Sequence, residues 1–98
     1  MSGQPITGRQ YAHINALASA TNIKSAPGSL FGVTINTKGA SSNVLTLYDT
    51  SGTSTTTVIA VIDTTQNVGT LKFQLDFASG LAYALATGTA ADVTISYS

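Results

Sequence analysis

His13 is the side chain best suited to proton transfer near neutral pH, because imidazole titrates in that range. A hydrolase would need a serine and an acid beside it, and the chain has no GxSxG nucleophile motif. A zinc site would need further ligands, whereas the sequence has one His, no Cys and no Glu. We therefore expect His13 to lie on the surface or in an interface, without a catalytic or metal-binding role.

The four carboxylates, all aspartates, are the second group that could do chemistry. Paired carboxylates can serve as acid and base, and carboxylates at positions 1, 3 and 5 of a loop can bind calcium. Asp49, Asp63 and Asp92 instead stand at expected strand ends beside turn residues, where an aspartate accepts local backbone N–H groups. Asp76 falls on the polar side of an expected strand. We therefore predict no catalytic residue and no metal site.

Glycine motifs that would hold a phosphate or a dinucleotide are also missing. Neither a GxGxxG nor a Walker sequence occurs in the chain, so we predict no cofactor. Because no acid–base pair, nucleophile or phosphate cradle stands out, we expect that the protein is not an enzyme.

The composition indicates a single all-β domain that depends on packing and assembly. The 98 residues include no Cys, and charged residues make up 8%, against roughly 25% in an average soluble domain. Ser and Thr together number 27, and such residues favour strands and turns over helices. A weakly charged surface on a small domain also indicates self-association.

The charge distribution and the lengths of the apolar runs argue against two kinds of partner. Net charge is zero and the four cations are scattered along the chain, whereas nucleic-acid binding needs a basic patch. No apolar run approaches the roughly 18 residues that would cross a bilayer. We expect a soluble protein that binds neither nucleic acid nor a membrane.

The clearest strand pattern is TLKFQLDF, residues 70–77. Leu71, Phe73, Leu75 and Phe77 alternate with polar residues, which is typical of a strand with one buried face and one exposed face. Two further runs of the same period, residues 81–86 and 93–97, follow after short turns and are expected to form a hairpin. Strands with one apolar face need a second layer to cover them.

Upstream, the chain continues as short strands separated by turn residues. We expect one strand over 10–20 and a turn at Thr21–Asn22, then a strand over 29–37 in which Gly32 marks a bulge or a close contact. In that strand Phe31, Val33 and Ile35 are expected to share a face, with Leu30 on the other.

Two strands in the middle of the chain have apolar residues on both faces. The strand over 43–49 has Val44 and Tyr48 on the face opposite Leu45 and Leu47, so it is either central or has an outer face that meets another subunit. The strand over 55–62 is apolar on both parities and is expected to be buried on both sides.

Seven to eight short strands at this spacing predict an all-β fold, a two-sheet antiparallel β-sandwich of jelly-roll or Ig-like type. Residues 1–10 contain Gly and Pro without periodicity, and we expect an extended N-terminal arm there, followed by a sandwich domain over 11–98. The arm is either a disordered terminus or a segment that binds a neighbouring subunit.

Four stretches carry a resemblance to a known family: SLFGVTINTKGA, NVLTLYDTSGTS, TVIAVIDTT and GTLKFQLDFASGLAYALATGTAADVTISYS. Over about residues 11–98 the chain resembles the small β-sandwich decoration proteins, also called cement or head-auxiliary proteins, of tailed bacteriophage capsids. The resemblance implies a structural virion protein, assembled in the host cytoplasm, that stabilises a capsid from outside. It also implies the major capsid protein as partner and a homotrimer as the assembled form.

The family pattern does not supply binding residues. We predict that Arg9, Gln10, Tyr11 and His13 form a protein-binding surface next to the arm. The alternative function is a carbohydrate- or cell-surface-binding β-sandwich module of a phage tail, fibre or adhesin. The four tyrosines could line such a sugar-binding face, although packing in a core or subunit interface fits them better.

Overall fold

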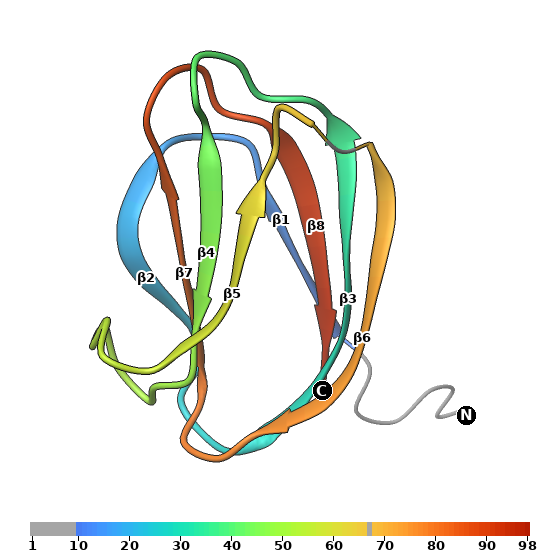
Figure 1. Ribbon diagram of the computed structural model, residues 1–98. Helices are drawn as coiled ribbons and strands as arrows, with labels where there is room; N and C mark the ends of the chain where they lie inside the picture. The colour runs from blue at the N-terminus through green and yellow to red at the C-terminus, as the bar shows by residue number, and fades with distance from the viewer. Residues whose placement is uncertain (1–9, 67) are drawn as a thin grey trace.

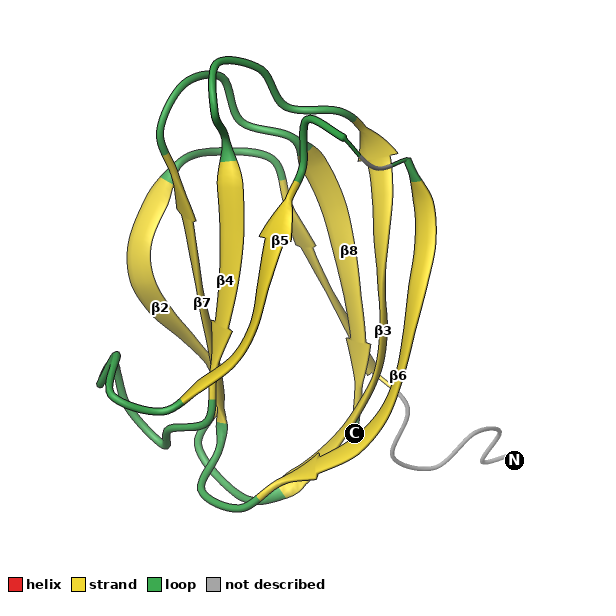
Figure 2. Ribbon diagram, viewed as in Figure 1, coloured by secondary structure: helices red, strands yellow, loops and turns green. Residues whose placement is uncertain are grey.

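The computed structural model describes residues 10–66 and 68–98, which form eight strands and no helix (Figures 1 and 2). Accordingly, none of the described residues belongs to a helix able to cross a membrane. The strands are β1 (Gln10–Ile14), β2 (Ala18–Lys24), β3 (Gly28–Thr37), β4 (Val44–Tyr48), β5 (Val58–Asp63), β6 (Gly69–Phe77), β7 (Leu81–Ala86) and β8 (Asp92–Tyr97). β1 begins at Gln10, and the rest of the predicted arm, residues 1–9, lies outside the described residues.

The strands form two antiparallel four-stranded sheets. Sheet A has the order β1-β8-β3-β6 and sheet B has the order β2-β7-β4-β5. Apart from β4 and β5, consecutive strands lie in different sheets, so the chain crosses repeatedly between the two layers (Figure 1). This confirms the predicted β-sandwich, and the strand order is that of a jelly roll. The predicted hairpin of the last two strands is wrong, because β7 lies in sheet B and β8 in sheet A.

The core lies between the sheets and is built from alternate residues of each strand. β4 contributes Leu45 and Leu47, β8 contributes Val93 and Ile95, and all four are fully buried. Their chain neighbours face outward and are more exposed, as a period of two requires. The alternation read from the sequence therefore assigns the inner and outer faces of these strands correctly.

The region predicted as one strand over 10–20 forms parts of two strands. β1 pairs with β8 in sheet A, whereas β2 pairs with β7 in sheet B, so the chain changes sheets between Ile14 and Ala18. The turn predicted at Thr21–Asn22 is also wrong. These two residues lie within β2 and pair with Tyr83 and Ala82, because the sheet partner overrides the local turn preference.

The predicted irregularity at Gly32 is confirmed. The register of β3 shifts between Leu30 and Gly32 against both neighbouring strands. As a result Leu30, Val33 and Ile35 are buried in the core, while Phe31 lies on the outer side of sheet A, half-buried. The expected grouping of Phe31 with Val33 and Ile35 is wrong because the bulge reverses the parity.

β5 is not buried on both sides as its sequence predicts. It is the end strand of sheet B and pairs with β4 alone. Ile62 is buried, but the side chains of Val58 and Val61 are 50% and 66% exposed. β5 therefore has the sequence pattern of a central strand, although it is an edge strand of the described fold.

A buried polar cluster ties three connections together at one end of the sandwich. Asn43 is fully buried, and its Nδ2 donates to the carbonyl oxygens of Thr87, at 2.9 Å, and Ala86, at 3.3 Å. Its Oδ1 accepts from Thr64 Oγ1 at 2.6 Å and from the backbone N–H of Ala91 at 3.1 Å. One side chain thus links the segments before β4, after β5 and between β7 and β8.

We expect Asn43→Ala to destabilise the protein by roughly 3 kcal/mol, because buried donors and acceptors lose their partner. Urea unfolding at fixed protein concentration measures this loss. The matched control is Asn15→Ala, which removes the same side chain from an exposed position between β1 and β2. Equal stability of the two variants would show that the cluster contributes nothing.

Candidate interaction surface

Asp49 is held by the turn between β6 and β7. Its Oδ2 accepts from the N–H of Ala78 at 2.8 Å, and its Oδ1 accepts from Ser79 at 2.8 Å and from Gly80 at 3.3 Å. The N–H of Ala78 and then that of Ser79 lower the pKa of Asp49 below 3.8, against a smaller effect of burial. The carboxylate therefore binds backbone N–H groups of a turn, but this turn is not the local one that the sequence predicted.

His13 and Asp92 meet across β1 and β8. Nε2 of His13 lies 2.7 Å from Oδ1 of Asp92, which also accepts from Asn36 Nδ2 at 3.0 Å. These hydrogen bonds, that of Asn36 first, lower the pKa of Asp92. His13, Asn36 and Asp92 lie on the outer side of sheet A, where two side chains bind the carboxylate of Asp92. This arrangement favours a role in joining β1, β3 and β8 over a role in proton transfer.

The other two carboxylates also have hydrogen-bond partners. Asp63 accepts from the N–H and Oγ1 of Thr65, at 2.9 and 2.6 Å, and the Oγ1 contact is the main cause that lowers the pKa of Asp63. Asp76 accepts from Ser29 Oγ at 2.6 Å. Within residues 10–66 and 68–98, no three His or Asp side chains come together as a metal site would require.

The predicted protein-binding residues lie on β1, at one edge of sheet A. Tyr11 is 72% exposed, Gln10 is exposed, and His13 is engaged with Asp92. Arg9 lies outside the described residues. Their role in binding a protein stays a prediction.

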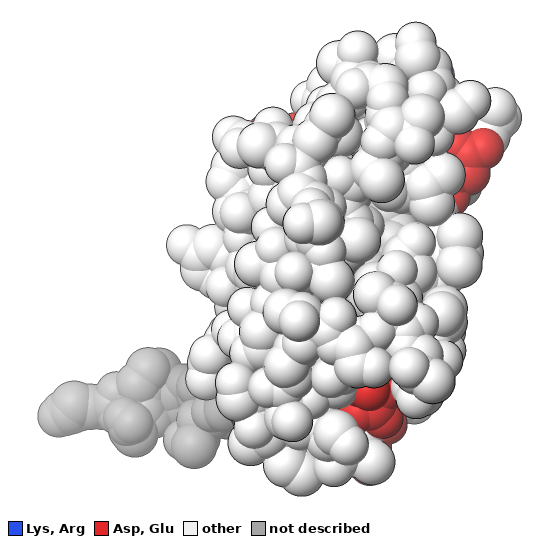
Figure 3. Space-filling view, turned by 90° about the vertical axis from the view of Figure 1, so that its left-hand side faces the viewer, with Lys and Arg blue, Asp and Glu red and all other residues white. Residues whose placement is uncertain are grey.

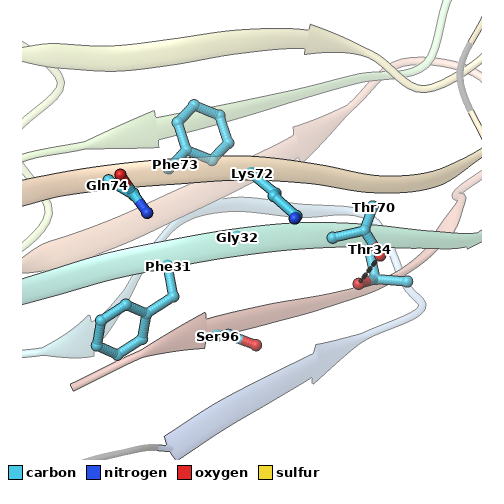
Figure 4. Close-up of a pocket in the computed structure, with 8 residues that line it drawn as sticks. All are labelled: Phe31, Gly32, Thr34, Thr70, Lys72, Phe73, Gln74 and Ser96. Atoms are coloured by element: carbon cyan, nitrogen blue, oxygen red, sulfur yellow. Dashed lines mark hydrogen bonds between the residues drawn. The ribbon is translucent and has the colours of Figure 1, made fainter.

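A shallow hollow of about 380 Å³ lies on the outer face of sheet A, above the bulge at Gly32 (Figure 4). Its polar groups include Lys72, Ser96 and the paired hydroxyls of Thr34 and Thr70, 3.0 Å apart. The residues that line it include neither a carboxylate nor a histidine, so the hollow lacks an acid–base pair.

The outer side of sheet B differs from that of sheet A in having almost no charge. The registers place Thr46 between Val61 and Ala84, and Tyr48 between Val58 and Ala82. We call this surface the sheet B face. Its outward-facing residues are Val44, Thr46, Tyr48, Val58, Val61, Ala82 and Ala84, of which Ala82 is fully buried.

Figure 3 looks at this side of the molecule, and no Lys or Arg atom is visible in the view. Acidic atoms show only near its two ends, and by the register Asp63 borders the face beside Val44. Contiguous apolar patches mark surfaces that bind other proteins, and here the exposed Val58 and Val61 lie beside Tyr48 and Thr46. Val44 and Tyr48 signalled this face in the sequence, because they indicated either a central strand or contact with another subunit, but the exposure of β5 was not predicted.

Comparison with known proteins identifies the fold. No family model matches the chain, and no curated protein matches it. Among solved structures, the chain is similar to the crystal structure of the Drosophila NLP-core, a nucleoplasmin-like core, which provides insight into pentamer formation and histone binding. The TM-score is 0.59 at 14% identity, covering 92% of this chain and 95% of that chain. At this identity the similarity shows the fold alone.

This comparison overturns the resemblance to phage decoration proteins. The matching structure is a nucleoplasmin-like core, so the predicted capsid-stabilising role, the major capsid protein as partner and the homotrimer are wrong. The carbohydrate-binding alternative has no support either. Alternating bulky and hydroxylated residues are shared by sandwiches of unrelated function. The quoted stretches are therefore evidence for the fold and not for a binding partner. The virion location stays a prediction.

The hydrogen bonds of Asp49 predict a specific acid sensitivity. Because the pKa of Asp49 is lowered in the folded state, the carboxylate stabilises the protein above the unfolded value of about 3.8. This contribution is lost as the pH falls through the lower, folded pKa. We expect Asp49→Asn to be less stable than the parent at pH 7, with a difference that shrinks below about pH 4.

Urea midpoints measured between pH 2.5 and 7 test this. Asp76→Asn is the matched control, because it removes the same charge from exposed β6 and leaves the β6–β7 turn bound to Asp49. The same pH profile in both variants would contradict the role of Asp49.

Proposed function

We propose that this protein is a structural, non-enzymatic subunit that associates with copies of itself through the sheet B face. The observation that carries the proposal is the exposure of Val58 and Val61 on an uncharged sheet surface. The one His–Asp pair of the described residues, His13 with Asp92, is also bound by Asn36 and lies apart from the hollow above Gly32, whose lining has no carboxylate.

The energetics favour contact between uncharged faces. Each valine side chain contributes roughly 1.5 kcal/mol when it is moved from water into a packed interface. No charged group within the face has to lose its hydration, a loss that offsets much of the gain in charged interfaces. Closed symmetric assembly then repeats the same contact in every subunit.

Five copies is the number we propose. The Drosophila NLP-core has the same fold over most of both chains, and its structure concerns pentamer formation. Histone binding is not part of the proposal. Histones are strongly basic and select acidic surfaces, whereas this chain has a net charge of zero and only four aspartates.

Light scattering and native mass spectrometry test the proposal. The 10.0 kDa chain should give a particle of about 50 kDa at micromolar concentration. Val61→Lys should dissociate it, because an unpaired ammonium buried in an apolar contact costs several kcal/mol.

Gln74→Lys is the control, since it adds the same charge at an exposed position of β6, on the outer side of sheet A. A monomer at tens of micromolar would refute self-association. A stable oligomer of another size would refute the number five alone.

A further inference from the structure

We infer that the contact between copies is centred on the edge strand β5, and that it extends from the sheet B face around β5 onto the side of the sandwich between β5 and β6. This inference rests on the proposed self-association and names its surface. The occupant of that surface is a second copy of this chain.

The first observation is the lack of protection on β5. Exposed edge strands are normally guarded by charges, prolines or bulges, because their free N–H and C=O groups pair readily with other strands. The other end strands contain a charged or titratable residue: His13 in β1, Lys24 in β2, Lys72 in β6. β5 has a charge only at its end, Asp63, and an irregularity near Ile59, where its register with β4 shifts. Between these two points Ala60, Val61 and Ile62 have no such protection.

The second observation is a row of apolar side chains on β6 that the described fold covers only in part. Leu71, Phe73 and Leu75 face the core side of sheet A but are only half-buried, whereas Phe77 in the same row is buried. Figure 4 shows Phe73 projecting from β6 to the side away from Lys72, towards the strands of sheet B. Ile59 of β5 is likewise half-buried. The described fold thus leaves apolar groups open along the side where β5 and β6 end the two sheets (Figure 1).

The third argument is area. The sheet B face spans three strands, β4, β5 and β7, which lie about 4.8 Å apart and are about five residues long, so it presents a flat patch of roughly 240 Å². A stable protein interface buries about 800 Å² per partner, so the sheet B face alone is too small. The side between the sheets is about 10 Å wide and adds roughly 160 Å², which raises the surface around β5 from less than a third of that area to about half of it. β5 is the strand that both surfaces share.

A second copy fits this surface better than a different protein does. Apart from Asp63 at the end of β5, neither the sheet B face nor the inward row of β6 has a charged residue that would select an acidic or basic partner. Copies of an uncharged apolar surface meet without like-charge repulsion, and the structurally similar NLP-core assembles with itself. In such an assembly β5 is covered on both faces, as its sequence pattern predicts.

Single-cysteine variants test the inference, because the chain has no cysteine of its own. Val58→Cys and Val61→Cys report on β5, and Val68→Cys reports on the connection between β5 and β6. Tyr11→Cys and Gln74→Cys are controls at exposed positions of sheet A. Each variant is labelled with a maleimide in its native state and in urea, and light scattering gives its mass in the same buffer.

In the oligomer we expect labelling to slow by about tenfold or more at the three valine positions, because the thiol reacts only when the contact opens. The two controls should keep their rates. Full reactivity at all five positions in a particle of oligomeric mass would overturn the inference and leave self-association standing. Protection at Val61 without protection at Val68 would confine the contact to the flat face and refute its extension around β5. A monomeric mass would refute the proposed function itself.

Discussion

The packing of the inner faces of the two sheets is the interaction on which the rest of the structure depends. With no disulfide available, alternate residues such as Leu45, Leu47 and Val93 supply the stability by filling the layer between the sheets. The period of two then fixes which residues face outward. Once Leu45 and Leu47 point inward, Val44, Thr46 and Tyr48 must form part of the opposite surface, and the scarcity of charge in the chain leaves that surface uncharged.

Much of the fold follows from the sequence because strand alternation is a local property. The positions of β4, β6 and β8 could be read from their period alone, and Gly32 signalled the bulge in β3. The outcome at Phe31 could not be read, because the direction of a side chain at a bulge depends on the register of the neighbouring strands. The change of sheet between β1 and β2 was hidden for a similar reason, since pairing partners for that segment lie at the far end of the chain.

The candidate surface was less predictable than the fold. An apolar run on both parities indicates burial, but it does not say whether the covering layer belongs to the same chain. Val61 therefore appeared to be a core residue, although it is exposed in the described fold. The aspartates show a related limit: Asp49 behaves as a turn-binding group, but the N–H groups of Ala78 and Ser79 lie in a connection that no local pattern links to it. The family resemblance failed because it was carried by features common to sandwiches, and these specify layers without specifying a partner.

The symmetry of the assembly limits which surface β5 can meet. A surface that pairs with the same surface of another copy gives a two-fold dimer, whereas a closed ring of five needs two different surfaces on each subunit. In a ring, therefore, the side with β5 must face another uncharged region of the next copy. The outer face of sheet A is less suited, since Lys72 and Asp76 would have to lose water there. A ring through β5 thus leaves the more polar outer face of sheet A free.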